Sequence, residues 1–208
     1  MNVVLYGATG MIGSRVLSEL LSRGHKVSAV VRDPSRVPQN PNVNAVKGDL
    51  LHTAGVAATI KGTDAVISAY NPGENAPAIV DATHSLIGAA KQAGVKRVIE
   101  VGGAGSLLVA PNVRLVDAPD FPAAWKAIAL AHGDALEVLR ASDLDWTYFS
   151  PAALIQPGER TGKFRLGKDT LLADANGKSE ISAEDYAVAL VDELENPQHI
   201  RQRFTIAY

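Results

Sequence analysis

The feature that most constrains this chain is a glycine-rich turn near its start, set between an apolar run and an amphipathic segment. The run Val3-Val4-Leu5-Tyr6 leads into Gly7-Ala8-Thr9-Gly10-Met11-Ile12-Gly13, and a second apolar run covers Val27–Val31. This order predicts a strand, a turn that opens a helix, and a second strand. The first turn of a helix has unpaired N–H groups and about half a unit of positive charge, so it suits a diphosphate. We therefore expect a nicotinamide dinucleotide site here.

The three glycines of this turn have separate predicted tasks. Gly7 lets the chain turn sharply off the strand, Gly10 removes a side chain where the backbone approaches the phosphates, and Gly13 lets the helix pack closely on the strands. Their spacing is GxxGxxG, whereas the standard fingerprint is GxGxxG, and such a triplet alone also fits a glycine-rich turn in another α/β protein. The strands on both sides of the segment favour the dinucleotide interpretation.

Charge, cysteine content and hydropathy exclude several other classes. The 208 residues carry a formal net charge of −2, which gives no electrostatic case for binding nucleic acid or an anionic membrane. There is no cysteine, and the histidines lack metal-ligand spacing, so we expect no metal. No apolar run approaches the ~20 residues of a membrane span. The first strand begins at once and leaves no room for a signal peptide, so we expect a cytoplasmic protein.

Apolar runs alternate with amphipathic segments over most of the chain. Strands are expected at 3–6, 27–31, 43–46, 65–69, 95–101 and 146–149, and helices at 11–23, 53–60, 76–93 and 121–141. Because each strand is nearly continuously apolar, this predicts a Rossmann-like, doubly wound parallel sheet with helices on both faces. We expect one domain over residues 1–208, with a dinucleotide-binding core at 1–150.

After residue 150 the pattern changes to a small substrate-side appendage at 151–208. Short alternating runs between Thr161 and Asp174 indicate small strands or a hairpin. Ser182 is expected to cap a closing helix that carries Glu184 and Asp185 in its first turn. A final strand is predicted at 203–207.

Ligands of open α/β sheets lie beyond the carboxyl ends of the strands, so the residues that follow each strand are candidates. Arg32 follows the second strand, about nineteen residues beyond Gly13. An acidic residue there would bind the adenosine ribose and favour NAD, whereas a guanidinium favours the 2′-phosphate of NADP. Arg36 is close, Asp33 could still reach the ribose, and Arg32 could be a solvated loop residue. We expect NADP(H) to be preferred and NAD(H) to be accepted as well.

Later strands add further candidates. Asp49 is placed either to accept a hydrogen bond from the adenine amino group or to cap the next helix. Ala69 and Tyr70 follow the fourth strand and are expected to line the ribose and nicotinamide side. The residues expected to contact the cofactor are Gly7, Ala8, Thr9, Gly10, Met11, Ile12, Gly13, Arg32, Asp49, Leu50, Ala69, Tyr70, Gly102, Gly103, Lys126, Ser150, Pro151 and Ala152.

The segment after the fifth strand lacks a common catalytic acid. Residues 102–106 lie where a short-chain dehydrogenase presents its serine, and Lys126 matches the lysine of its Tyr-x-x-x-Lys pair. The tyrosine position is Pro122, which has no proton to give, so a tyrosine acid at this spacing is excluded. The catalytic residue is unassigned, and the candidates are Lys126, His132 and Ser106. Lys126 could instead be a solvated helix residue, and His132 an interior one.

Several segments spread over nearly the whole chain carry a family likeness. They are the glycine turn, Val31-Arg32-Asp33, Gly48-Asp49, the strand Ala65–Ala69, Leu136-Glu137-Val138-Leu139-Arg140, Ser150-Pro151, Thr161-Gly162-Lys163-Phe164 and Ile181-Ser182-x-x-Asp185-Tyr186. With these the chain resembles an atypical short-chain dehydrogenase/reductase, more narrowly the biliverdin-IXβ reductase and NAD(P)H-flavin reductase-like group. The resemblance implies an NADPH-dependent reductase of flat conjugated acceptors, with direct hydride transfer and a proton from solvent. Gly103 departs from the serine or threonine often found there in the flavin reductases.

The leading hypothesis is thus an NAD(P)H-dependent oxidoreductase that transfers hydride to a flavin, a quinone or a similar small acceptor without a catalytic tyrosine. An alternative is a non-catalytic NADP(H)-binding redox sensor that presents residues 107–121 to a partner. A third is a sugar-nucleotide epimerase or dehydratase, which the missing tyrosine and the short C-terminal part disfavour. Residues 107–122 are expected to form a lid or a packed surface loop, and the protein to be a monomer or a homodimer.

Overall fold

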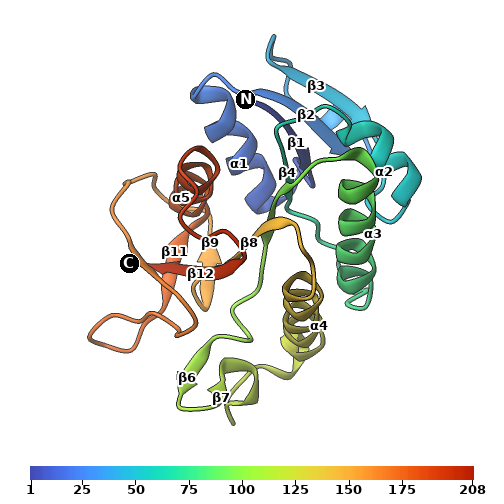
Figure 1. Cartoon of the computed structure of the whole chain (residues 1–208). Coiled ribbons are helices and arrows are strands. Elements are labelled where there is room, and N and C mark those ends of the chain that lie inside the picture. Colours follow the sequence, from blue (N-terminus) through green and yellow to red (C-terminus); the bar gives the residue numbers. More distant parts are fainter.

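The computed structural model of the chain describes residues 1–208 and contains an eight-stranded sheet with helices on both faces (Figure 1). In sheet order the strands are β3 (Val43–Lys47), β2 (Lys26–Val31), β1 (Asn2–Tyr6), β4 (Ala65–Ser68), β5 (Arg97–Val101), β8 (Asp145–Ser150), β12 (Gln202–Ala207) and β10 (Arg165–Gly167). The helices are α1 (Met11–Ser22), α2 (Thr53–Ile60), α3 (Ala78–Ala93), α4 (Ala123–Arg140) and α5 (Ala183–Glu195). The predicted doubly wound fold is confirmed.

The strand order reverses between β1 and β4. β1 pairs in parallel with β2 on one side, where Tyr6 lies opposite Val30, and with β4 on the other, where Tyr6 lies opposite Ser68. Only β10 runs antiparallel, against β12 at the edge of the sheet. Ligands of such sheets bind in the crevice at the reversal, beyond the carboxyl ends of the strands. Tyr6 ends β1 and so leads the glycine turn directly into that crevice.

Two groups of helices cover the sheet, because the central strands are apolar on both sides. Helices α1 and α5 pack together on one face, and α2, α3 and α4 cover the other (Figure 1). The core beneath α1 and α5 joins Leu5 of β1 to Val16 of α1 and Leu190 of α5. The core on the opposite face joins Val66 of β4 to Leu86 of α3. Each face of the sheet therefore has its own packed core.

Local signals in the sequence set the ends of the helices. The first, α1, ends before Gly24, whose φ of 80° is in the left-handed region that glycine adopts most readily. Helix α5 is preceded by its N-cap Ser182, whose hydroxyl oxygen accepts a hydrogen bond from the Asp185 N–H at 3.0 Å. Glu184 and Asp185 lie in the first turn of α5, where the helix dipole favours negative charge. The predicted cap is confirmed.

One buried carboxylate fastens the C-terminal appendage. Asp185 accepts hydrogen bonds from the N–H groups of Thr161 and Gly162, both at 2.8 Å. It also accepts from the hydroxyls of Thr161 and Tyr208, at 2.6 and 3.0 Å. The next residue, Tyr186, donates its hydroxyl to the carbonyl of Phe149 at 2.6 Å. Two segments that carry the family likeness, 161–164 and 181–186, are therefore bonded to each other and to the main sheet.

The structure adds short strands that the sequence does not show. Of the small strands expected at 161–174 it has one, β10, which extends the main sheet. A separate parallel pair is formed by β9 (Leu154–Gln156) and β11 (Glu180–Ser182). A hairpin is formed by β6 (Leu108–Ala110) and β7 (Val113–Arg114). Strands of two or three residues are too short to display the alternation from which strands are predicted.

The β6–β7 hairpin lies against the appendage. The Leu108 N–H donates to the carbonyl of Asp169 at 2.8 Å, and the Leu108 carbonyl accepts from the Leu171 N–H at 2.9 Å. These bonds join the segment after β5 to the segment after β10. Residues 107–122 were expected to form a lid or a packed surface loop. The structure shows that the start of this segment is packed through its backbone.

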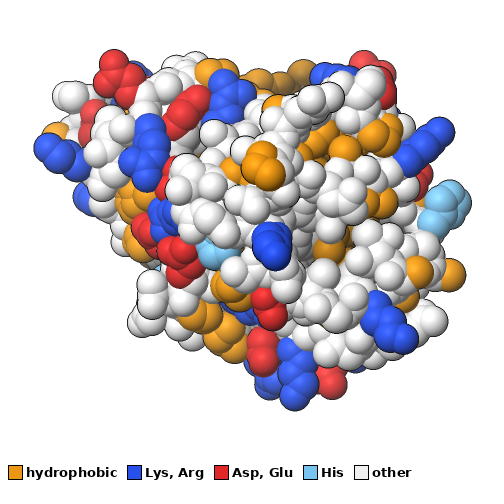
Figure 2. Space-filling model, turned by 90° about the horizontal axis from the view of Figure 1, so that it is seen from above, with side chains coloured by type: hydrophobic (Ala, Val, Ile, Leu, Met, Phe, Trp, Pro, Cys, Tyr) orange, Lys and Arg blue, Asp and Glu red, His pale blue; other side chains and the backbone are white.

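The surface carries charges of both signs. Figure 2 shows basic and acidic side chains interspersed over the face seen from above Figure 1. Such mixing gives that face no single-sign field for steering a polyanion. No helix is both long and apolar enough to cross a bilayer.

Candidate functional site

The glycine turn occupies the crevice between β1 and β4. Gly7 has a φ of 76°, and a Cβ added to it would overlap the carbonyl oxygen of Ala69 at the end of β4. A Cβ on Gly13 would overlap the carbonyl oxygen of Gly7. Both positions therefore require glycine, the first for its backbone angle and both for close approach. The turn is therefore held against β4 at Gly7 and against the start of α1 at Gly13, with no room for a side chain at either glycine.

The N-terminus of α1 points into this crevice with no side chain capping it. Gly10 is the N-cap, with φ −77° and ψ 173°, and it donates its N–H to the Gly7 carbonyl at 3.0 Å. The first turn of α1 contains no acidic residue. The positive end of the helix dipole is therefore left for an anionic ligand. This is the arrangement that receives the diphosphate of a dinucleotide.

A cavity of about 470 Å³ extends from the turn across the ends of β2, β3 and β4. Its volume is within the range of small-molecule sites. Of the predicted cofactor residues, it is lined by Gly7, Thr9, Gly10, Arg32, Asp49, Leu50, Ala69 and Tyr70. Asn71 and Asn75, which the sequence did not single out, also line it. The structure therefore brings together residues from four separate turns at the adenosine end of the predicted site.

The other residues of the turn lie beside this cavity. Ala8 is buried, and Ile12 packs against the core beneath α1. Met11, the first residue of α1, is exposed. Their side chains support the turn or face solvent, so any contribution to binding comes from their backbone.

Two cations at this end have no partner within the chain. The guanidinium groups of Arg32 and Arg36 line the cavity and make no hydrogen bond or ion pair with another residue. Asp33, between them, caps a short 3-10 turn by accepting from the Ser35 N–H and hydroxyl at 3.1 and 2.6 Å. The Ser35 hydroxyl bond lowers the pKa of the Asp33 carboxyl. Asp33 is thus engaged in its own loop, while both arginines are free.

Asp49 and Tyr70 line the same cavity. One oxygen of Asp49 accepts from the Leu51 N–H at 3.0 Å, while the N-cap of α2 is His52. The helix-cap alternative for Asp49 is therefore wrong, and its second carboxylate oxygen is left for a ligand. Burial, followed by the charge of Asp49, raises the pKa of Tyr70, so this phenol stays protonated.

The residues predicted for the nicotinamide end lie at the ends of β5 and β8. A Cβ on Gly102 would overlap the ring of Tyr148, and a Cβ on Gly103 would lie 3.0–3.1 Å from His132. The side chains of Ser150 and Ala152 are buried, with exposed fractions of 0% and 1%. Pro151 between them is buried as well. At this end a ligand would therefore meet the backbone of these residues, with the rings of Tyr148 and His132 packed beside Gly102 and Gly103.

Tyr148 is a central residue here that sequence reasoning missed. Its hydroxyl lies 2.7 Å from the His132 carbonyl, 3.3 Å from His132 Nδ1 and 3.3 Å from the Gly103 N–H. Burial raises the pKa of Tyr148 and lowers the pKa of His132 to about 4, so both side chains are neutral. In the sequence, a tyrosine in an apolar strand that bonds to a neighbouring histidine looks the same as a tyrosine that only packs in the core.

The other two catalytic candidates have different surroundings. Ser106 Oγ is 2.8 Å from Nη1 of Arg203, a buried arginine that also binds Asp169 at 2.7 and 2.9 Å. Ser106 is therefore tied into an ion cluster that fastens the β6–β7 region to β12. Lys126 is exposed in the first turns of α4 and has no partner. Pro122 is the N-cap of that helix.

A buried acid without an ion pair lies between β5 and α3. Glu100 in β5 is 5% exposed, and its Oε1 lies 2.7 Å from the hydroxyl of Thr83 on α3. The same hydroxyl lies 3.0 Å from the Ile79 carbonyl. The other carboxyl oxygen, Oε2, has no partner. Burial raises the pKa of Glu100 to about 7.

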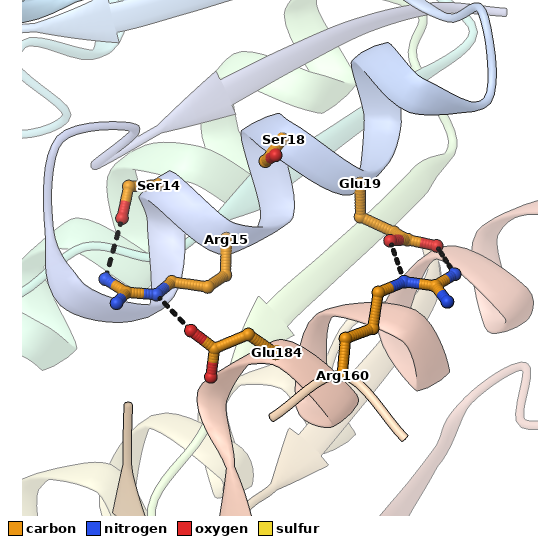
Figure 3. Close-up of a pocket in the computed structure, with 6 residues that line it drawn as sticks. All are labelled: Ser14, Arg15, Ser18, Glu19, Arg160 and Glu184. Atoms are coloured by element: carbon orange, nitrogen blue, oxygen red, sulfur yellow. Dashed lines mark hydrogen bonds and ion pairs between the residues drawn. The ribbon is translucent and has the colours of Figure 1, made fainter. Parts of the chain in front are cut away.

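A polar cavity of about 340 Å³ lies on the outer side of α1 (Figure 3). Its charged residues pair with one another. Arg15 of α1 binds Glu184 of α5 at 2.9 Å, and Glu19 of α1 accepts two bonds from Arg160 of the appendage at 2.8 and 2.9 Å. These pairs clamp the phosphate-binding helix to α5 and the appendage, and they leave no free charge for a ligand.

Fold and site together define a dinucleotide-binding protein of the Rossmann class. The glycine turn at the strand reversal, the uncapped α1 and the adenosine-end cavity are the parts of such a site. Residues 7–197 match the model of the NAD(P)H-binding family, and the chain belongs to this family.

Similar proteins cover the whole chain. It is 41% identical to the "Uncharacterized protein YwnB" of Bacillus subtilis, over 99% of this chain and 98% of that protein. It is 43% identical to a solved "putative epimerase" of Bacteroides thetaiotaomicron, with a TM-score of 0.93 and coverage of 100% and 96%. It is 33% identical to a solved "putative NADH-flavin reductase" of Streptococcus pneumoniae, with a TM-score of 0.88 and coverage of 100% and 99%. The predicted membership of an NAD(P)H-binding family is confirmed, and the predicted resemblance to the flavin reductase-like group agrees with the last of these structures.

Proposed function

We propose that the chain is a reductase that uses NADPH in preference to NADH and passes a hydride to a flat conjugated acceptor of the flavin or quinone type. The observation that carries this proposal is a complete dinucleotide cradle beside a helix, α4, whose tyrosine position is Pro122. The bound cofactor supplies the hydride. The protein contributes binding and orientation, and a proton can come from solvent.

The donor groups around the site fit the cofactor. The uncapped N-terminus of α1 suits the diphosphate, and Gly10 at the N-cap has no side chain to keep a phosphate from the backbone. Asp49 has a carboxylate oxygen for the adenine amino group. Arg32 and Arg36 supply guanidinium groups for a 2′-phosphate, which only NADP(H) carries.

The missing tyrosine favours reduction of a conjugated acceptor over epimerisation. Reduction of an isolated ketone or epimerisation at a sugar carbon needs a group that moves a proton at the reacting oxygen. Pro122 cannot do so, and Ser106 is bound to Arg203. A conjugated ring can take a hydride at one position and spread the charge over the rest. This supports a reductase over an epimerase. Of the similar solved structures, one is named a putative epimerase and another a putative NADH-flavin reductase.

Cofactor choice tests the role of Arg32. A charged hydrogen bond contributes about 1.5–3 kcal/mol, so Arg32→Ala should weaken NADPH binding about ten- to a hundredfold and leave NADH binding nearly unchanged. Fluorescence titration of both cofactors measures this, with the exposed Lys61→Ala as the matched loss of a surface cation. An unchanged ratio of NADPH to NADH affinity in Arg32→Ala would refute the assignment.

Turnover tests the reductase itself. Purified protein with NADPH should oxidise it in the presence of flavins or quinones, as followed by the loss of NADPH absorbance. Gly7→Ala, whose new methyl group overlaps the Ala69 carbonyl and so displaces the turn, should show neither binding nor oxidation. Tight NADPH binding with no oxidation above background across both acceptor classes would refute the reductase. The same result would favour the redox sensor, in which residues 107–121 face a partner.

A further inference from the structure

The hydroxyl of Tyr148 determines which nitrogen of His132 carries the proton. The His132 carbonyl and the Gly103 N–H have fixed roles, because a carbonyl only accepts and an amide N–H only donates. Tyr148 has one proton, and the carbonyl at 2.7 Å is the closest acceptor. With that proton committed, the hydroxyl oxygen can only accept from the Gly103 N–H and from His132 Nδ1, each at 3.3 Å. Nδ1 must therefore carry the proton.

The imidazole of His132 is neutral, so a proton on Nδ1 leaves Nε2 with a lone pair. Burial without a nearby carboxylate lowers the pKa of this ring to about 4, which agrees with a single proton. Nε2 has no partner within the chain. The side-chain nitrogen and oxygen atoms that are fully buried and lack a hydrogen-bond partner are Arg97 Nε, Glu100 Oε2, Trp146 Nε1 and Ser150 Oγ. Nε2 is not among them, so it is reachable from outside.

The reachable edge of the ring lies beside the turn that follows β5. Cδ2, the carbon bonded to Nε2, is 3.1 Å from the place where a Cβ of Gly103 would be. A Cβ at position 103 would press against this edge, and the glycine leaves it uncovered. The carboxyl end of β5, the neighbour of β4 in the sheet, lies at the same edge as the crevice in which ligands of this fold bind.

We propose that Tyr148 holds His132 as the Nδ1–H tautomer, so that Nε2 selects acceptor molecules that offer it an N–H or O–H donor. This rests on the proposed reductase function and narrows its substrate class. A flavin ring offers the imide N3–H, whereas a simple quinone offers only carbonyl oxygens, which would face the lone pair. His132 then acts as a specificity-determining hydrogen-bond acceptor, and Tyr148 as the residue that positions it. In this tautomer His132 is not the acid of the reaction.

Two measurements test the proposal, and the first needs no turnover or ligand. In protein labelled with ¹⁵N-histidine, the ring nitrogens of His132 should show a protonated Nδ1 and an unprotonated Nε2 near neutral pH. Tyr148→Phe keeps the ring against Gly102 and removes the hydroxyl. The ¹⁵N chemical shifts of both His132 ring nitrogens should then move toward the average of the two tautomers. A protonated Nε2 in the unaltered protein would overturn the proposal.

The second measurement compares lumiflavin with 3-methyllumiflavin, which lacks the N3–H. Flavin fluorescence in the presence of NADP⁺ gives both dissociation constants without any reduction. Methylation should weaken binding about tenfold, the effect of one lost hydrogen bond. His132→Asn keeps a donor near the Nδ1 position and has no Nε2, so it should bind both flavins equally. Equal binding by the unaltered protein would overturn the proposal. Failure to oxidise NADPH with lumiflavin would instead refute the reductase and leave both measurements valid.

Discussion

Glu100→Gln should change how the stability of the protein depends on pH. The Thr83 hydroxyl has one proton and lies within bonding distance of two acceptors, Glu100 Oε1 and the Ile79 carbonyl. Both contacts are satisfied if Glu100 is protonated, donates to Thr83 and lets Thr83 donate to Ile79. The absence of any ion pair to Glu100 and its burial favour the same neutral form. Glutamine can make the same contact through its amide.

The magnitude follows from the pKa. Folding raises the pKa of Glu100 from its ordinary value of 4.5 to about 7, and each unit corresponds to about 1.36 kcal/mol, so the full effect is about 3 kcal/mol. Because the folded pKa is above the unfolded one, this stabilisation is fully present below pH 4.5 and is lost as pH rises through about 7. Between about pH 5 and about pH 8 the unaltered protein should lose about 2–3 kcal/mol relative to Glu100→Gln.

Urea unfolding of both proteins at these two pH values measures the difference, and other titrating groups cancel in the comparison. Glu74→Gln, at an exposed glutamate without an ion pair, is the matched control and should follow the unaltered protein. If the stability difference between the unaltered protein and Glu100→Gln is the same at both pH values, Glu100 is not a neutral buried acid and the proton assignment is wrong.

Two further predictions concern residues that hold the site in place. Gly7→Ala should lower the free energy of unfolding by more than about 1 kcal/mol and abolish NADPH binding, because the new methyl meets the Ala69 carbonyl at a positive φ. Urea unfolding and cofactor titration check this, and unchanged binding would contradict it. Asp185→Ala should cost about 2–3 kcal/mol, because the Thr161 and Gly162 N–H groups both lose the carboxylate oxygen that accepts from them. An unaltered thermal midpoint would show that the carboxylate is not the anchor.

The adenosine end of the site could be predicted because its signals are local. Gly7 and Gly13 are required by a single turn, and Arg32 follows directly from the end of a strand. Apolar runs and their spacing place each strand, and the rule that ligands bind beyond the carboxyl ends places the residues after them. The core strands and all five helices were found in this way to within a few residues.

The side-chain contacts at the nicotinamide end could not be predicted, because they join residues that are distant in the sequence. Tyr148 meets His132 across 16 positions and Arg203 meets Ser106 across 97, and both contacts depend on the register of β8 and β12. Nothing in the sequence around Ser106 shows that its hydroxyl is engaged by a buried arginine. Buried polar partners of this kind are set by tertiary packing, which periodicity does not report.

The clamp on α1 has a consequence for the thermodynamics of cofactor binding. Arg15, Glu19 and Arg23 hold this helix to α5 and the appendage by ion pairs before any ligand arrives. The diphosphate cradle is therefore preorganised and loses little conformational entropy on binding. Arg32 and Arg36, in contrast, are unrestrained, and immobilising such side chains costs about 0.5–1.5 kcal/mol each. The free energy that separates NADPH from NADH binding is thus the gain from the contact between the arginines and the 2′-phosphate minus the entropy cost of fixing two flexible side chains.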